Sequence, residues 1–85
     1  MNVIMSNSIY NDFAAQFAAS SITSLVDSFN REVGNRGWCS ARAAYIKALI
    51  DELKRRGIDL SAVCNEGSTS FAHKVKCVDN RLVLI

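Results

Sequence analysis

The sequence predicts an α+β fold in which two N-terminal helices, or three, are followed by a C-terminal antiparallel β-hairpin. Two observations support this prediction. Apolar residues recur at helical spacing through most of residues 9–56. Near the C-terminus, two short runs rich in β-branched residues flank an Asp-Asn pair. Since a domain typically comprises about 100 residues, the 85 residues are expected to form a single domain, 1–85.

Residues 1–7 precede the first helical pattern. We expect this segment to be disordered or to supply a short third strand, from Asn2 to Met5, because an isolated hairpin gains stability from a further strand. Met5 is also a second candidate for the start of the chain, after Met1.

The first helical segment extends from about Ile9 to Val33 and is expected to end at the glycines that follow. Between Ser20 and Ser24, hydroxyl-bearing residues with capping ability interrupt the apolar stripe. The stripes before and after this point are displaced by roughly a quarter turn. Two interpretations therefore stay open. The helix is kinked, or it breaks near Ser20–Ser24 into two helices, with Ser24 and Asp27 as a capping box.

The second long helix is predicted from Ala41 to Arg56, with Ser40 as its N-cap. Its apolar residues fall on one face, as expected for a helix that packs on a core. The residues of this core stripe are Tyr45, Ile46, Leu49, Ile50 and Leu53.

The other faces of this helix also carry a pattern. Ala41, Ala44 and Ala48 form a strip of small side chains along one flank, which would let another helix approach closely. The polar face carries two oppositely charged pairs at i,i+4 spacing, Lys47–Asp51 and Asp51–Arg55.

The end of the helix is predicted to be a Schellman motif. Gly57 occupies the C′ position, and Ile58 is placed to contact Leu53 one turn earlier. Asp59 is then placed to cap one further turn through Val63.

The hairpin is predicted from two strands, Phe71–Val78 and Arg81–Ile85, with residues 64–70 as a loop before them. The two-residue turn fixes a register in which Cys77 faces Leu82. This register gives a core face of Phe71, His73, Val75, Cys77, Leu82 and Leu84, and an outer face of Lys74, Lys76, Val78, Arg81, Val83 and Ile85. A longer loop would shift the pairing by one residue and exchange the two faces.

The sequence carries no pattern of catalytic or metal-binding residues. The only histidine, His73, lies ~13 Å from Cys77 along one predicted strand, so the two residues cannot form a catalytic pair or share a metal ion. Cys39, Cys64 and Cys77 lack C-x-x-C spacing and are interpreted as small buried hydrophobic residues. We therefore expect no enzyme activity, no cofactor and no metal site, and a chain that folds without zinc.

The basic residues are the candidates for contacts with a partner. Ten Lys and Arg against eight Asp and Glu give a net charge of +2, and all ten lie in residues 31–85. Six of them are candidate contacts to a nucleic acid or to a partner protein: Arg42, Lys54, Arg55, Lys74, Lys76 and Arg81.

Each of these candidates also has a structural interpretation. Arg42 lies on the core stripe, where its guanidinium could bind a carboxylate or a phosphate or extend into water. Lys54 and Arg55 complement the helix macrodipole. The basic residues of the hairpin could discourage strand pairing or contact phosphates. Trp38 is expected to fill the corner between the two long helical segments.

The expected function is that of a small cytoplasmic, non-catalytic protein that binds another protein as an adaptor or regulator. Irregular cysteine spacing favours a reducing compartment. The N-terminus lacks the features of a signal peptide, and no apolar run reaches the ~18 residues of a transmembrane helix, so no membrane is expected among the partners. The alternative is a DNA-binding regulator, because helices followed by a basic hairpin are similar to a winged-helix domain, with helix 41–56 as the recognition helix.

A homodimer is also expected. Val83 and Ile85 on the outer face need a cover, since an edge strand that only faces solvent is usually blunted by charge, Pro or a bulge. The segment Val3–Met5 could cover them within one chain, or a twofold-related copy could do so. We favour the second copy, because a domain of this size has a thin core and gains most from added burial.

Overall fold

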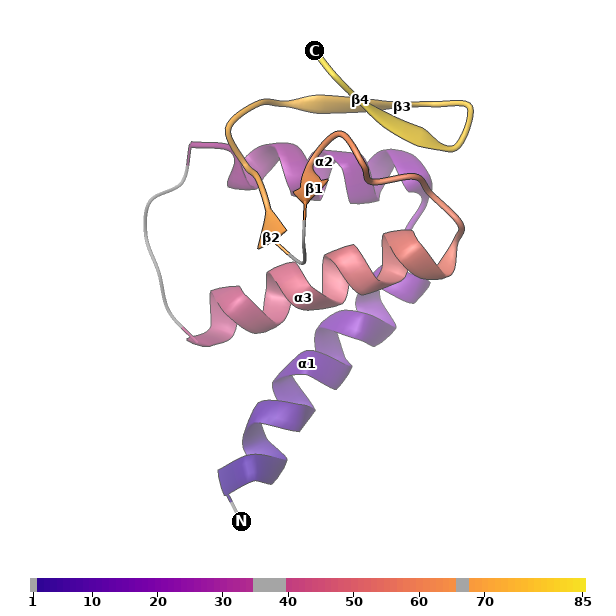
Figure 1. The fold of residues 1–85 in the computed structure, drawn as a ribbon. Helices are drawn as coiled ribbons and strands as arrows, with labels where there is room; N and C mark the ends of the chain where they lie inside the picture. The colour runs from indigo at the N-terminus through magenta and orange to yellow at the C-terminus, as the bar shows by residue number, and fades with distance from the viewer. Residues whose placement is uncertain (1, 35–39, 66–67) are drawn as a thin grey trace.

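The computed structural model describes residues 2–34, 40–65 and 68–85. Within these residues the elements are three helices and four short strands (Figure 1): α1 (Asn2–Ala18), α2 (Ile22–Glu32), α3 (Ser40–Arg55), β1 (Cys64–Asn65), β2 (Ser68–Thr69), β3 (Val75–Val78) and β4 (Arg81–Leu84). This confirms the predicted α+β fold with a C-terminal hairpin, and it selects three helices over two.

Helix α3 lies at the centre of the fold. It packs against α1 on one side and contacts α2 on another, and α2 in turn packs against β3 (Figure 1). The hairpin and the N-terminal end of α1 lie at opposite ends of the molecule. One cluster of buried side chains joins these layers: Phe17, Leu25, Phe29, Ala48, Leu49, Ile50, Leu53, Ile58, Leu60, Val63, Val75 and Leu82.

The break between α1 and α2 falls at residues 19–21, beside the predicted position. Ser21 is the N-cap of α2, and its side chain accepts a hydrogen bond of 3.1 Å from the Ser24 backbone N–H. The predicted capping box of Ser24 and Asp27 is therefore wrong. Ser24 lies inside the first turn of α2, because Ser21, three residues earlier, already supplies the cap.

The prediction of a third strand at Asn2–Met5 is also wrong. These residues belong to α1, which begins at Asn2 and not near Ile9. No Gly or Pro lies between Asn2 and Ile9 to stop a helix from continuing. Because this end of α1 is remote from the hairpin (Figure 1), it does not cover the outer face of the hairpin.

The central helix largely follows the prediction. Leu49, Ile50 and Leu53 are buried, and Tyr45 and Ile46 are half-buried against the core. The side chain of Ser40, the predicted N-cap, lies outside the described residues, as do Trp38 and Cys39.

The end of α3 confirms the predicted Schellman motif. Gly57 has a φ of +76°, its N–H donates to the Lys54 carbonyl at 3.0 Å, and the Ile58 N–H donates to the Leu53 carbonyl at 3.1 Å. The carboxylate of Asp59 then accepts from the Ser61 N–H at 2.9 Å, and so caps the turn that follows, as predicted.

The β3–β4 hairpin has the predicted register. Val78 pairs with Arg81 and Cys77 pairs with Leu82. Asp79 and Asn80 have φ values of 53° and 61°, the left-handed conformations that a type I′ turn requires. The first strand is shorter than predicted: it begins at Val75, and the ladder continues by one further bond from the Ile85 N–H to the Lys74 carbonyl.

The predicted core face of the hairpin is confirmed in part. Val75 and Leu82 are buried, and Phe71 and Cys77 are half-buried against the core. Leu84 is exposed, contrary to the prediction. His73, which was expected on the same face, precedes β3 and is exposed as well. Both lie towards the end of the hairpin away from its turn, and alternation along a strand does not reveal where the helices beneath it stop.

The segment expected to be a loop contains the short pair β1–β2. Cys64 pairs with Thr69, and the Ser70 N–H donates to the Val63 carbonyl at 2.7 Å. The side chain of Cys64 is half-buried and not fully buried as predicted.

Candidate interaction surface

The outer face of the β3–β4 hairpin comprises the six residues Lys74, Lys76, Val78, Arg81, Val83 and Ile85. Across the two strands each cation lies opposite an aliphatic side chain, with Lys76 facing Val83 and Val78 facing Arg81. Five of the six are exposed, and Val83 is half-buried. The result is a surface in which aliphatic and positively charged groups alternate.

The hairpin carries exposed large hydrophobic side chains. Within residues 9–34, 41–64 and 69–85, for which the structure describes side-chain burial, four such residues are exposed: Ile9 (38% exposed), Val78 (39%), Leu84 (49%) and Ile85 (74%). The last three belong to β3, β4 and the residue after β4. Val78 and Ile85 lie on the outer face beside the three cations, whereas Leu84 lies on the opposite face of the sheet. Aliphatic side chains set among charged ones are typical of a surface that contacts another molecule.

The cations of the outer face differ in their surroundings from those on α3. Among the described residues, none of Lys74, Lys76 and Arg81 lies within ion-pair distance of a carboxylate. Arg81 acts on the carboxylate of Asp59 only through its charge. The pKa of Asp59 is lowered mainly by the backbone hydrogen bond from Ser61 and, to a smaller extent, by the charge of Arg81. The outer face therefore presents positive charge that the described residues leave largely uncompensated.

The free edge of β3 is closed by a side chain of α2. Asn30 donates from Nδ2 to the Val75 carbonyl at 2.9 Å, and its Oδ1 accepts from the Val75 N–H at 2.8 Å. The amide thus takes the place of a neighbouring strand for one residue and fixes the hairpin on α2.

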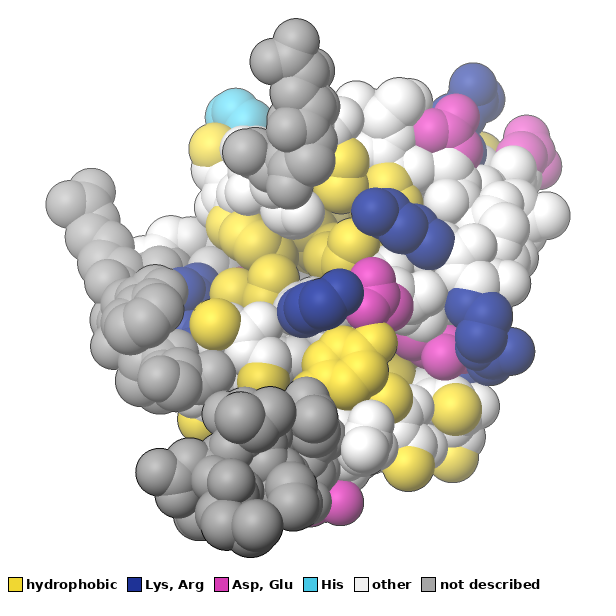
Figure 2. All heavy atoms as spheres, turned by 60° about the horizontal axis from the view of Figure 1, so that its bottom comes forward, with side chains coloured by type: hydrophobic (Ala, Val, Ile, Leu, Met, Phe, Trp, Pro, Cys, Tyr) yellow, Lys and Arg dark blue, Asp and Glu magenta, His cyan; other side chains and the backbone are white. Residues whose placement is uncertain are grey.

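The other predicted contact residues lie elsewhere. Arg42 pairs with Glu32 of α2 at 2.6 Å, with both side chains largely buried, and lies beside Phe13 and Tyr45. Lys54 is exposed on the last turn of α3. Arg55 contacts Glu52 and not Asp51, so the second predicted i,i+4 pair is wrong, whereas Lys47–Asp51 is present at 3.0 Å. Figure 2 shows such paired charges, with Lys and Arg side chains next to Asp and Glu.

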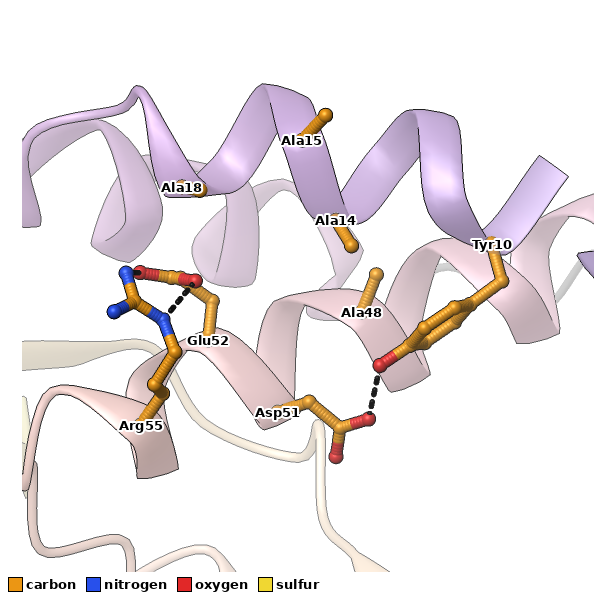
Figure 3. Close-up of a pocket in the computed structure, with 8 residues that line it drawn as sticks. All are labelled: Tyr10, Ala14, Ala15, Ala18, Ala48, Asp51, Glu52 and Arg55. Carbon is orange, nitrogen blue, oxygen red and sulfur yellow. Dashed lines mark hydrogen bonds and ion pairs between the residues drawn. The ribbon is translucent and has the colours of Figure 1, made fainter. Parts of the chain in front are cut away.

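A groove of about 340 Å³ lies between α1 and α3. Ala14 and Ala48 face one another across it (Figure 3), which agrees with the prediction that small side chains on α3 admit a second helix. Tyr10 donates to Asp51 at 2.5 Å, and the Arg55–Glu52 pair lies further along the groove (Figure 3).

The polar groups of this groove satisfy one another. The hydrogen bond to Asp51 raises the pKa of Tyr10. Burial raises the pKa of Asp51, but hydrogen bonds from Tyr10 and Lys47 outweigh it, so that the pKa is lowered overall. Lys47 Nζ also lies 5.6 Å above the Tyr10 ring. We interpret the cluster as a link between α1 and α3.

The sequence analysis did not predict one cluster of charged side chains, which joins the end of α3 to the end of α1. Glu52 is 5% exposed and accepts hydrogen bonds from both Arg55 and Arg56. Arg56 also donates to the Phe17 and Ser20 carbonyls at 2.9 and 2.6 Å, and so caps the C-terminal end of α1. The i,i+4 spacing of Glu52 and Arg56 was visible in the sequence, but their contact with α1 was not.

The structure shows where the only histidine lies. His73 is exposed. No set of three His, Cys, Asp or Glu side chains among the described residues could hold a metal ion. No described helix is both long enough and apolar enough to cross a membrane.

Comparison with protein-family models, with curated proteins and with solved structures gives no match for this chain.

Proposed function

We propose that the protein is a small cytoplasmic adaptor or regulator that acts by binding another protein through its β3–β4 hairpin. The observation that carries this proposal is the exposure of Val78 and Ile85 beside three cations on the outer face of one hairpin. Aliphatic side chains surrounded by charged ones are the usual composition of a protein-binding surface. Cys64 and Cys77 are free thiols, which supports a reducing compartment.

Affinity capture from host cells, with two matched variants, tests this function. In the double variant Val78→Ser/Ile85→Ser the hairpin loses two exposed aliphatic side chains, and captured protein should fall by about tenfold. Ile9→Ser removes an exposed aliphatic side chain of α1, away from the hairpin, and should leave capture unchanged. Circular dichroism checks that both variants keep their helices. Equal capture by the wild type and the double variant would refute the proposal.

The alternative function is DNA binding, which the basic outer face supports. Lys74, Lys76 and Arg81 could contact phosphates. Two observations argue against α3 as a recognition helix. Helices α1 and α2 cover two of its sides, and its exposed Lys47 and Arg55 are already paired with carboxylates. A shift of random duplex DNA that weakens steeply with salt would favour DNA over a protein partner.

The hairpin could also form the interface of a homodimer. The aliphatic side chains that a partner would cover could equally be covered by a second copy. Light scattering at micromolar concentration distinguishes the two states, since a dimer has about twice the monomer mass of 9.3 kDa. If a dimer forms through β4, Val83→Lys should dissociate it; a dimer that withstands this substitution uses the helices.

A further inference from the structure

We propose that the outer edge of β4 binds an extended segment of another protein, rich in acidic and aliphatic side chains, as a third strand of the sheet. This inference rests on the proposed function and names the chemistry of the partner. Three features carry it: the direction of the backbone groups of β4, the contact of Asp59 at the start of this edge, and the charge of the hairpin.

The hydrogen-bond pattern shows which backbone groups point away from β3. The Ile85 N–H donates to the Lys74 carbonyl at 2.9 Å, so Lys74 and Ile85 form a hydrogen-bonded pair. Such pairs alternate along an antiparallel ladder, and the next ones are Lys76–Val83 and Val78–Arg81. The N–H and carbonyl groups of Leu82 and Leu84 therefore face the outer edge of β4.

The start of this edge already carries one strand-like contact. The Asp59 N–H donates to the Asn80 carbonyl at 2.8 Å, and the Leu82 N–H donates to the Asp59 carbonyl at 2.9 Å. The chain then turns away, since the Val63 N–H donates to the Leu60 carbonyl. Among the described residues, the Leu82 carbonyl and both backbone groups of Leu84 have no strand partner. An added segment can begin there, where Asp59 leaves the edge.

The side chains around this edge indicate what the segment carries. Leu84 and Ile85 are exposed on opposite faces of the strand, so aliphatic side chains of a third strand would have a partner on each face. Arg81 flanks the edge, and Lys74 and Lys76 lie on the same outer face. The strands β3 and β4 contain no acidic residue. A second copy would bring the same cations together, whereas an acidic segment would neutralise them.

Fluorescence anisotropy with labelled synthetic peptides tests the inference on the full chain. The probe is a short peptide of alternating Glu and Val, which should bind, and bind more weakly as salt is raised. The same peptide with Lys in place of Glu should bind at least about tenfold more weakly. A peptide with N-methylated backbone groups, which cannot donate strand hydrogen bonds, should lose binding to a similar degree.

Two variants of the protein locate the binding. Leu84→Pro removes an N–H that points to the outer edge and leaves the β3–β4 bonds in place, so peptide binding should fall by about tenfold. Arg81→Glu should weaken binding, whereas Lys54→Glu, with the same charge change on α3, should not. Circular dichroism verifies the fold of each variant.

Each contrary outcome has a distinct meaning. Equal binding of the Glu and Lys peptides, or of the N-methylated one, overturns the inference. The inference is also overturned if the Glu peptide does not bind at all. If host-protein capture still requires Val78 and Ile85 in that case, the proposed function stands without the inference. A particle of twice the monomer mass that the Glu peptide does not dissociate assigns the edge to a second copy and overturns the inference.

Discussion

At the scale of single residues, two side chains hold together segments that are distant in the sequence. Arg56 extends from the end of α3 to the carbonyls at the end of α1. Asn30 extends from α2 to the backbone of β3. Both are polar residues whose side chains donate hydrogen bonds to main-chain carbonyl groups of a distant segment. Each can be tested against a chemically identical substitution elsewhere.

Arg56→Ala should lower the free energy of unfolding by ~2–4 kcal/mol, because it leaves buried Glu52 with one arginine and removes the cap of α1. Arg55→Ala has the same charge change, but the Arg55 side chain is 64% exposed, so solvent screens its ion pair and its loss should destabilise the protein much less than the loss of Arg56. Urea denaturation measures both values. Equal losses would show that the carbonyl contacts of Arg56 contribute nothing.

Asn30→Asp preserves the size of the side chain but replaces the amide donor by an oxygen. The Val75 carbonyl then loses its hydrogen bond and faces a carboxylate, which should cost ~1–3 kcal/mol. Asn11→Asp makes the same change on the exposed face of α1 and should alter stability by less than about 0.5 kcal/mol. Thermal unfolding monitored by circular dichroism compares the two variants; similar melting temperatures would contradict the role of Asn30.

At the scale of elements, α3 was predicted best and the hairpin was predicted in part. The core stripe of α3, its Schellman end and the register of the hairpin depend on short-range patterns, and all are observed. The predictions of the capping residue of α2 and of the start of α1 were wrong, because several neighbouring residues had similar capping ability. No local signal showed that Asn30 would take the place of a strand beside β3.

The core position of α3 leads to a prediction for Leu49 and Leu53, both fully buried. Truncation of either residue to Ala should cost ~2–5 kcal/mol, since a cavity remains where the side chain packed. Lys54→Ala on the exposed face serves as the control and should change stability by less than about 0.5 kcal/mol. Melting temperatures that stay unchanged in both leucine variants would reject the assignment of this helix face to the core.

At the scale of the whole molecule, three carboxylates have a pKa that folding lowers, and they link stability to pH. Hydrogen bonds from Arg55 and Arg56 lower the pKa of Glu52 despite its burial. The pKa values of Asp51 and Asp59 are also lowered. The folded protein therefore holds these protons less tightly than the unfolded chain does. The stabilisation is complete above the unfolded-state pKa of about 4 and is lost as the pH falls through the lower folded-state pKa values.

We accordingly expect the free energy of unfolding to fall steadily as the pH is lowered below about 4. Glu52→Gln removes the titrating group and should make this decline shallower, although the variant is less stable at neutral pH. Denaturation curves recorded across the acid range measure the slope directly. An identical slope in the wild type and in Glu52→Gln would show that the Glu52 cluster does not contribute to acid unfolding.

The sequence by itself determined the elements whose signals lie within a few residues. Gly57 ends α3, Asp79 and Asn80 form the turn, and the turn sets which residues of the hairpin share a face. These features follow from backbone conformations and spacings that do not depend on the rest of the chain.

Only the tertiary structure decided which polar groups meet and which apolar ones stay exposed. Arg56 reaches α1 across 39 positions of sequence, and Asn30 reaches Val75 across 45. Leu84 belongs to the core face of the hairpin by alternation, yet it is exposed while Leu82 is buried. Strand periodicity assigns a side chain to a face, but only the packing of the helices determines how far along that face the core extends.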